Sequence, residues 1–162
     1  MTVGAVARTA PELAGDLNLV LNGLRLRGLN GPNGFMRMTG WNRQRYFKSV
    51  QVHVAIALNR IGRTALAQVE PERKRLRITV RHPGVFDEDS LRACVKPLLD
   101  GLRTRGIRIG GRVVASEKGV LKDDSPEWLH HDVIQSRGTY RVLVECFSPL
   151  LRARMRGLTV EI

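Results

Sequence analysis

The sequence predicts a single domain in which strands and helices alternate in a βαβαβ-like order. The chain has 162 residues, an ordinary length for one domain and enough to bury a core. Its hydrophobic fraction of 43% is typical of a globular protein, and no apolar run is as long as a membrane span. Apolar residues recur at every second position or at every third or fourth, and these spacings predict the individual strands and helices.

The first part of the chain is predicted to contain a leader, a strand and a long helix. Residues 1–16 lack the basic start and long apolar stretch of a signal peptide, so we expect a short flexible leader before a domain spanning 17–162. Residues 17–26 partly alternate and predict a first strand, which a glycine-rich loop follows. In residues 41–61 apolar side chains recur every three or four positions, which predicts an amphipathic helix ending near Gly62.

A second strand and a second helix are predicted further along. Residues 76–81 alternate cleanly between apolar and polar side chains, as a half-buried strand does. Residues 91–102 carry leucine and valine at helical spacing, with Asp89 or Ser90 as the expected N-cap. Pro97 interrupts this pattern, because a proline inside a helix removes a hydrogen bond and clashes with the preceding turn. Either the helix kinks at Pro97, or regular helix begins near it and the preceding residues form a separate turn.

The last part of the chain predicts further strands. Residues 140–147 alternate in the same way, and residues 158–162 are expected to add one more strand. Cys94 and Cys146 lie far apart and lack metal-ligand spacing, so we expect two reduced thiols in a cytoplasmic protein, with Cys146 inside a strand.

Basic residues dominate the composition and are unevenly placed. The formal net charge is +12, arginine outnumbers lysine 22 to 5, and no acidic residue lies between Asp16 and Glu70. An ordinary solvated surface mixes both signs, so this acid-free stretch predicts nucleic acid as the partner in preference to another acidic ligand. The residues of the stretch that we expect to contact DNA are Arg37, Arg43, Arg45 and Lys48.

Carboxylates nevertheless gather at two places in this basic chain. Five of the 15 acidic residues fall in residues 87–89 and 123–124. A carboxylate cluster repels a polyphosphate, but it suits a hard divalent cation, which prefers oxygen ligands. Such a cation can bridge the protein to a phosphodiester and polarise the phosphoryl oxygen. The two clusters therefore predict a metal-dependent nuclease, and the alternative is that both are solvated turns.

The residue types suggest how such a site would work. Asp87 and Asp89 project to the same side if their backbone is extended. With Asp124 beside them they could hold one or two Mg²⁺, for which Mn²⁺ is expected to substitute. The metal would lower the pKa of bound water, and Lys96 could neutralise the scissile phosphate or protonate the leaving oxygen. The competing interpretation makes residues 87–90 a helix cap and the segment after Asp124 an ordinary turn.

The order of these motifs resembles that of the RusA-type crossover junction endodeoxyribonucleases. With the first strand, the glycine-rich loop and the basic helix, the resemblance spans roughly residues 17–148. The segments that carry it are Asp87-Glu88-Asp89-Ser90, then Lys96-Pro97-Leu98-Leu99-Asp100-Gly101-Leu102, then Leu121-Lys122-Asp123-Asp124-Ser125.

The resemblance implies an α+β fold, a single domain with a mixed β-sheet packed against two main helices. It implies a homodimer that binds four-way (Holliday) DNA junctions and nicks them symmetrically with magnesium. The implied catalytic residues are Asp87, Asp89, Asp124 and Lys96, and Asp123 beside Asp124 joins the three aspartates as an implied metal ligand.

The sequence departs from the family pattern at three places. Ser90 stands where asparagine usually follows the Asp-x-Asp motif, and Lys96 lies about three residues further from Asp89 than usual. The connection after the second helix is also longer, and we expect its basic residues, among them Arg103 and Arg105, to contact DNA. The main alternative to the nuclease is a non-catalytic basic nucleic-acid-binding module.

Overall fold

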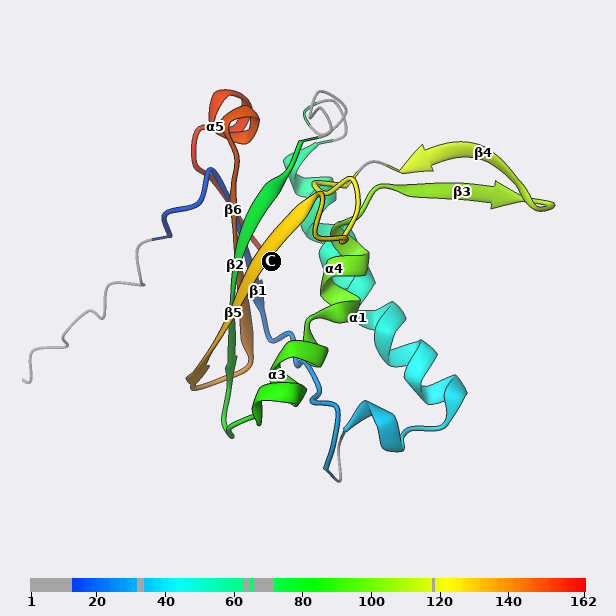
Figure 1. Ribbon diagram of the computed structural model, residues 1–162, viewed down its shortest axis with the longest axis vertical. Coiled ribbons are helices and arrows are strands. Elements are labelled where there is room, and N and C mark those ends of the chain that lie inside the picture. Colours follow the sequence, from blue (N-terminus) through cyan, green and yellow to red (C-terminus); the bar gives the residue numbers. More distant parts are fainter. Residues whose placement is uncertain (1–12, 32–33, 63–64, 66–71, 118) are drawn as a thin grey trace, which may run out of the picture.

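A five-stranded mixed β-sheet, in the order β5-β2-β6-β1-β7, forms the framework of an α+β domain (Figure 1). The computed structural model describes residues 13–31, 34–62, 65, 72–117 and 119–162. The strands of the sheet are β1 (Leu17–Asn22), β2 (Lys74–His82), β5 (Leu129–Arg137), β6 (Arg141–Phe147) and β7 (Leu158–Glu161).

The pairing of the strands is mixed. β2 runs parallel to β5 and antiparallel to β6, while β1 runs antiparallel to β6 and parallel to β7. The first five residues of β1 are all buried, in keeping with its place inside the sheet. Alternate residues of β2 are buried, because only one face of that strand packs against the core.

Three helices cover one face of the sheet: α1 (Gly40–Ile61), α3 (Glu88–Cys94) and α4 (Lys96–Leu102) (Figure 1). A Cβ added at Gly101 would lie 3.0 Å from the Cβ of Val54, so α4 and α1 pack closely at this glycine. Two short helices, η1 (Phe35–Arg37) and α5 (Pro149–Met155), complete the helical segments.

The structure confirms the α+β class and most of the predicted elements. The long helix begins one residue earlier than predicted, with Thr39 as its N-cap, and Gly62 follows it with φ of 99°. The expected strands at 76–81, 140–147 and 158–162 correspond to β2, β6 and β7. The first strand is shorter than predicted, because β1 ends at Asn22.

The predicted second helix is two helices that meet at Val95. The second alternative for Pro97 is therefore closer to the structure, since Pro97 lies in the first turn of α4, where proline is tolerated. The predicted N-cap was wrong. Asp87, and not Asp89 or Ser90, caps α3 by accepting a hydrogen bond from the backbone N–H of Ser90 at 2.7 Å.

Five elements were not predicted, and one of them is η1, which lies in the segment expected to be a glycine-rich loop. β5 escaped prediction because, of its nine residues, only Leu129 is buried, and α5 is a single short helix. The connection between α4 and Val120 holds an antiparallel hairpin of β3 (Arg105–Ile109) and β4 (Arg112–Glu117).

Other expectations concern the cysteines and the start of the chain. Both cysteines are buried and unbonded, and Cys146 lies in β6 as predicted. Burial raises the pKa of each thiol to about 12, so both remain protonated at neutral pH.

Residues 1–12 of the expected leader lie outside the described residues, whereas Asp16 is buried and accepts a hydrogen bond from Ser148 N–H at 3.0 Å. Within the described ranges no helix is both long and apolar enough to cross a membrane.

Candidate functional site

Three aspartates and two cationic side chains meet along one side of α4 and at its C-terminal end. We call this group, which consists of Lys96, Asp100, Arg103, Asp123 and Asp124, the α4 cluster. Lys96 Nζ pairs with the carboxylate of Asp124 and lies 3.1 Å from Oδ1 of Asp100. Arg103 Nη1 lies 3.0 Å from Oδ1 of Asp124 and 3.3 Å from Oδ1 of Asp123. The structure thus brings together Lys96, Asp123 and Asp124, which the sequence had singled out.

Local structure explains why these residues meet. Lys96, Asp100 and Arg103 follow one another at spacings of four and three, so they share one side of α4 and its end. Leu121 then ties the returning chain to the end of the helix through its backbone. Its N–H donates to Leu102 O at 3.0 Å, and its carbonyl accepts from Thr104 N–H at 2.8 Å. The two aspartates that follow Leu121 are therefore held beside α4.

The contact between Lys96 and Asp124 keeps both side chains charged at neutral pH. The hydrogen bond from Lys96 lowers the pKa of Asp124 to about 2, and the same bond raises the pKa of Lys96. Three carboxylates and two cations give the cluster a formal charge of −1. A phosphate that approaches Lys96 and Arg103 must therefore compete with aspartates already bound to them.

Asp87 and Asp89 lie elsewhere, at the N-terminus of α3, and both are exposed. The prediction that they project to one side required an extended backbone, whereas the chain is helical from Glu88 onward. Asp89 lies in α3 whereas Lys96 is the first residue of α4, so the two side chains belong to different helices that meet at Val95. No described contact joins Asp87 or Asp89 to the α4 cluster.

The described residues do not fit the metal ion that the sequence predicted. Carboxylate oxygens are the right chemistry for Mg²⁺. In the described part of the chain, however, no three His, Cys, Asp or Glu side chains are grouped so that they could hold a metal. Asp123 and Asp124 are paired with cationic side chains instead, and Asp87 is engaged as a helix cap.

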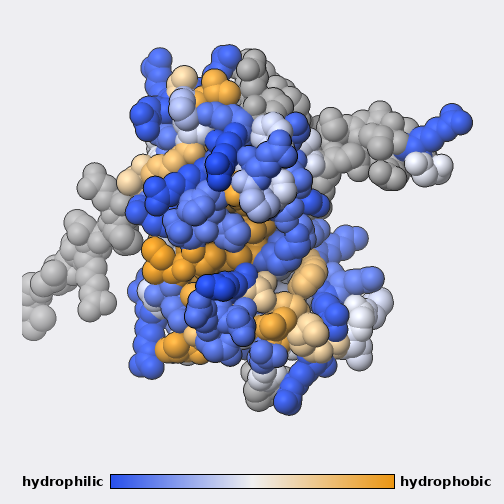
Figure 2. All heavy atoms as spheres, in the orientation of Figure 1, coloured by the Kyte–Doolittle hydropathy of each residue, from blue (hydrophilic) through white to orange (hydrophobic). Residues whose placement is uncertain are grey.

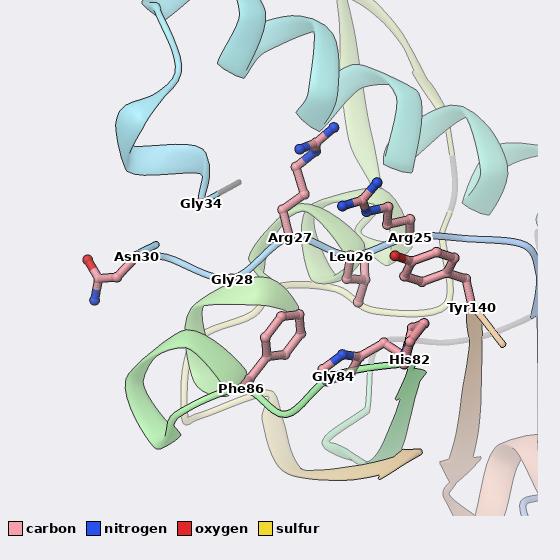
Figure 3. A pocket seen from close by; sticks show the side chains of 11 residues that line it. Arg25, Leu26, Arg27, Gly28, Asn30, Gly34, His82, Gly84, Phe86 and Tyr140 are labelled. Carbon is pink, nitrogen blue, oxygen red and sulfur yellow. The ribbon is translucent and has the colours of Figure 1, made fainter. Parts of the chain in front are cut away.

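A pocket of about 220 Å³ opens beside the segment that leads to Asp87 (Figure 3). We call it the cationic pocket, because Arg25 and Arg27 line it together with the rings of His82, Phe86 and Tyr140. The rings of His82 and Phe86 stack with centroids 4.0 Å apart, and the guanidinium of Arg25 lies 5.2 Å from the centre of the Tyr140 ring. No aspartate or glutamate is among the described residues of its lining, so the pocket suits an anionic ligand.

Two sets of hydrogen bonds hold the walls of the cationic pocket. The side-chain amide of Gln135 accepts from Phe86 N–H at 2.9 Å and donates to Phe86 O at 3.0 Å. Ser90 Oγ accepts from the backbone N–H groups of Leu29 at 3.1 Å and Asn30 at 3.4 Å. The Ser90 side chain thereby docks the glycine-rich loop on α3. This pocket was not predicted, although two of its arginines, Arg25 and Arg27, lie in the acid-free stretch of the sequence.

The residues predicted to contact DNA have different environments. Arg37, Arg45 and Lys48 are exposed, and the guanidinium of Arg45 lies 4.5 Å from the centre of the Trp41 ring. Arg43 is partly buried, and its side chain donates to Phe35 O at 3.2 Å, so it attaches η1 to α1. The two remaining arginines of the prediction are Arg103, which belongs to the α4 cluster, and Arg105, whose backbone lies in β3.

The exposed cations of α1 give a first prediction. The variant Arg45→Ala/Lys48→Ala should bind DNA more weakly, and the slope of log affinity against log salt should fall by about 0.9 for each phosphate that the variant no longer binds. Fluorescence anisotropy over a salt series measures both quantities. Gln44→Ala, which changes an exposed neutral neighbour, is the matched control. An unchanged slope in the double variant would place this part of α1 away from the DNA.

No protein-family model, curated protein or solved structure matches this chain. What the protein does must therefore be inferred from its own residues and their arrangement.

Proposed function

We propose that the protein is an endodeoxyribonuclease that cleaves branched DNA, with the α4 cluster as the site of phosphodiester hydrolysis. The observation that carries the proposal is the convergence of Lys96 and Asp100 with Asp123 and Asp124. These residues come from two segments of the motif order that resembles the RusA-type nucleases. The contact of the Lys96 ammonium with Asp124, 28 residues away, joins the two segments at one point.

The side chains of the α4 cluster supply the chemistry that hydrolysis needs. The guanidinium of Arg103 matches two oxygens of a phosphate, and Lys96 adds a compact positive charge. Once a phosphate binds Lys96, Asp124 loses the hydrogen bond that lowers its pKa and becomes a better base for an attacking water. Lys96 can then stabilise the charge that develops on the phosphoryl group or protonate the leaving oxygen. No step of this chemistry is routed through a metal ion, because the described residues hold no group of three ligands for one.

A second feature of the protein, the cationic pocket, favours nucleic acid as the substrate. The cationic pocket offers positive charge for a phosphate and aromatic rings on which an unstacked base can lie. Branched DNA exposes such bases where its helices part. A four-way junction also has approximate two-fold symmetry, so we include in the proposal a homodimer that makes one nick with each copy. Light scattering at micromolar concentration should then give a mass near twice 18.1 kDa.

A second candidate is a basic module that binds branched DNA without cleaving it. The observation in its favour is that Asp87 serves as the N-cap of α3 and no described group of three ligands is present. In this case the α4 cluster has a structural role, holding the returning chain against α4.

The experiment that separates the two candidates is a cleavage assay on a synthetic four-way junction beside a linear duplex of matched sequence. It is run with Mg²⁺, with Mn²⁺ and with a chelator. Paired nicks in the junction but not in the duplex support the nuclease. If the junction is still nicked in the presence of the chelator, the side chains of the α4 cluster are sufficient for cleavage. If cleavage requires Mg²⁺, the carboxylates must rearrange to bind the metal. Tight junction binding without cleavage under every condition supports the binding module and overturns the nuclease.

A further inference from the structure

The hairpin of β3 and β4, here called the β3–β4 ribbon, stands away from the body of the protein (Figure 1). Gly110 and Gly111 form its turn with φ of 56° and 79°, which is the geometry that two-residue hairpin turns require. A Cβ added at either glycine would meet no atom within 4 Å, so the tip is free of the body. Figure 2 shows the hydrophilic tip projecting into solvent.

The base of the ribbon is anchored at the α4 cluster. Arg103 precedes β3 by two residues, Asp123 and Asp124 follow β4, and the side chain of Arg103 pairs with both aspartates. Thr104 adds a further tie, since its hydroxyl accepts from Gly119 N–H at 3.1 Å. Within the described part of the chain the ribbon makes no extensive contact with another strand or helix. It is therefore an arm fixed at the candidate site and free at its tip.

The sequence of the ribbon is basic. It contains Arg105, Arg108 and Arg112 and a single acidic residue, Glu117, which is the register partner of Arg105. The other two arginines lie toward the turn, where Arg108 is opposite Val113 and Arg112 is opposite Ile109. The pairing shifts between Ile107 and Arg108, and such a bulge increases the right-handed twist of a ribbon. Positive charge is therefore concentrated on the free half of the arm.

The dimensions of a two-stranded ribbon decide which nucleic-acid groove it fits. Its backbones lie about 4.8 Å apart, and with side chains the ribbon fills the major groove of B-DNA, which is about 12 Å wide. The minor groove, at about 6 Å, admits such a ribbon only where the DNA is bent and the groove widened, and the major groove of duplex RNA is deep and narrow. Five residues of strand reach about 17 Å, which exceeds the depth of the DNA major groove, about 8.5 Å.

We propose that the β3–β4 ribbon is a DNA-binding arm that enters the major groove of a duplex beside the phosphate bound at the α4 cluster. The inference rests on the proposed function in taking DNA as the partner and the α4 cluster as the place where its phosphate binds. The arm holds one duplex of a branched substrate in a fixed position relative to Lys96 and Asp124, because its base includes the residue that pairs with Asp124.

The test compares the wild-type chain with Arg108→Ala/Arg112→Ala and with the charge-conserving Arg108→Lys/Arg112→Lys. Anisotropy titrations over a salt series use a four-way junction, a linear DNA duplex and a duplex RNA of the same sequence. The alanine variant should lose about ten-fold in DNA affinity and about 1.8 in salt slope, with the lysine variant close to wild type. RNA affinity should be unchanged in both variants.

A methylation-protection assay identifies the groove. Guanine N7 lies in the major groove, so wild-type protein should protect a short run of guanines that the alanine variant leaves reactive. The proposal of a DNA-binding arm would be overturned if the alanine variant kept the wild-type DNA affinity and salt slope. It would also be overturned if the alanine variant still protected the same guanines from methylation. If the wild-type chain cleaves junctions under the same conditions, the proposed function stands although the arm fails. If the wild-type chain binds no DNA, both proposals fail.

Discussion

Asp124→Asn should reduce the rate of junction cleavage by about 100-fold or more and leave junction binding equal to wild type or tighter. Asparagine keeps the shape of the side chain but cannot accept the proton of an attacking water, and general-base catalysis contributes at least about this factor. Binding should not weaken, because the substitution removes a negative charge that competes with phosphate for Lys96 and Arg103. Single-turnover cleavage at saturating protein, with affinity measured separately, gives both quantities.

Two further aspartates make this result specific. Asp132→Asn is the matched control, because Asp132 lies on β5 and pairs with Arg75 at 3.3 Å outside the α4 cluster. It should cleave as wild type does. Asp89→Asn separates the α4 cluster from the metal site that the sequence predicted. A wild-type cleavage rate in Asp89→Asn would mean that Asp89 takes no part in hydrolysis at the α4 cluster. A loss of cleavage rate equal to that of Asp124→Asn would mean that Asp89 joins the site when substrate binds. Wild-type cleavage by Asp124→Asn itself would contradict the proposed function.

Arg77→Leu should lower the free energy of unfolding by about 3 kcal/mol, because it leaves a buried carboxylate without its cationic partner. Arg77 binds Glu145 through two hydrogen bonds, from Nε at 2.7 Å and from Nη2 at 2.6 Å. The Glu145 side chain is only 5% exposed, and these hydrogen bonds lower its pKa, so it stays charged at neutral pH. Urea unfolding followed by circular dichroism measures the change.

Arg75 provides the matched control on the same strand. Its side chain is 65% exposed and pairs with Asp132, so Arg75→Leu should cost less than about 1 kcal/mol. Adding Glu145→Gln to Arg77→Leu should restore part of the stability, since the buried group is then neutral. Equal losses in the Arg77 and Arg75 variants would show that burial of Glu145 does not govern this contact.

The predictable parts of the fold are those in which burial follows a simple period. Val50, Val54 and Leu58 mark the buried side of α1, and β2 alternates throughout its length. β5 has no such signal, because it is an edge strand paired with β2 alone and most of its side chains are partly or fully exposed. The β3–β4 ribbon did carry a signal, since Gly110-Gly111 separates two strand-like runs by two residues.

The candidate site was predictable only in part, since Asp87 and Asp89 lie outside the α4 cluster and Asp100 was not among the predicted site residues. The motif order singled out Lys96 and Asp124, which the structure places in contact. It could not show that the Asp87 carboxylate accepts a hydrogen bond from a backbone N–H of α3. A helix cap and a metal site both use an aspartate carboxylate, so the residue type alone does not distinguish them. Nor could it assign Arg103 to the aspartates rather than to DNA, since that choice depends on where the returning chain is tied to α4.

The place of β1 in the sheet has a consequence for how the protein is made. β1 lies between β6 and β7, so the strand synthesised first is paired only with strands from residues 141–147 and 158–161. Contacts between segments so far apart in the chain are slow to form. Leu17, Leu19 and Leu21, which are fully buried in the finished sheet, stay unpaired on the ribosome until nearly the whole domain has emerged. Nascent chains of this protein should therefore depend on chaperones that shield the N-terminal strand during translation.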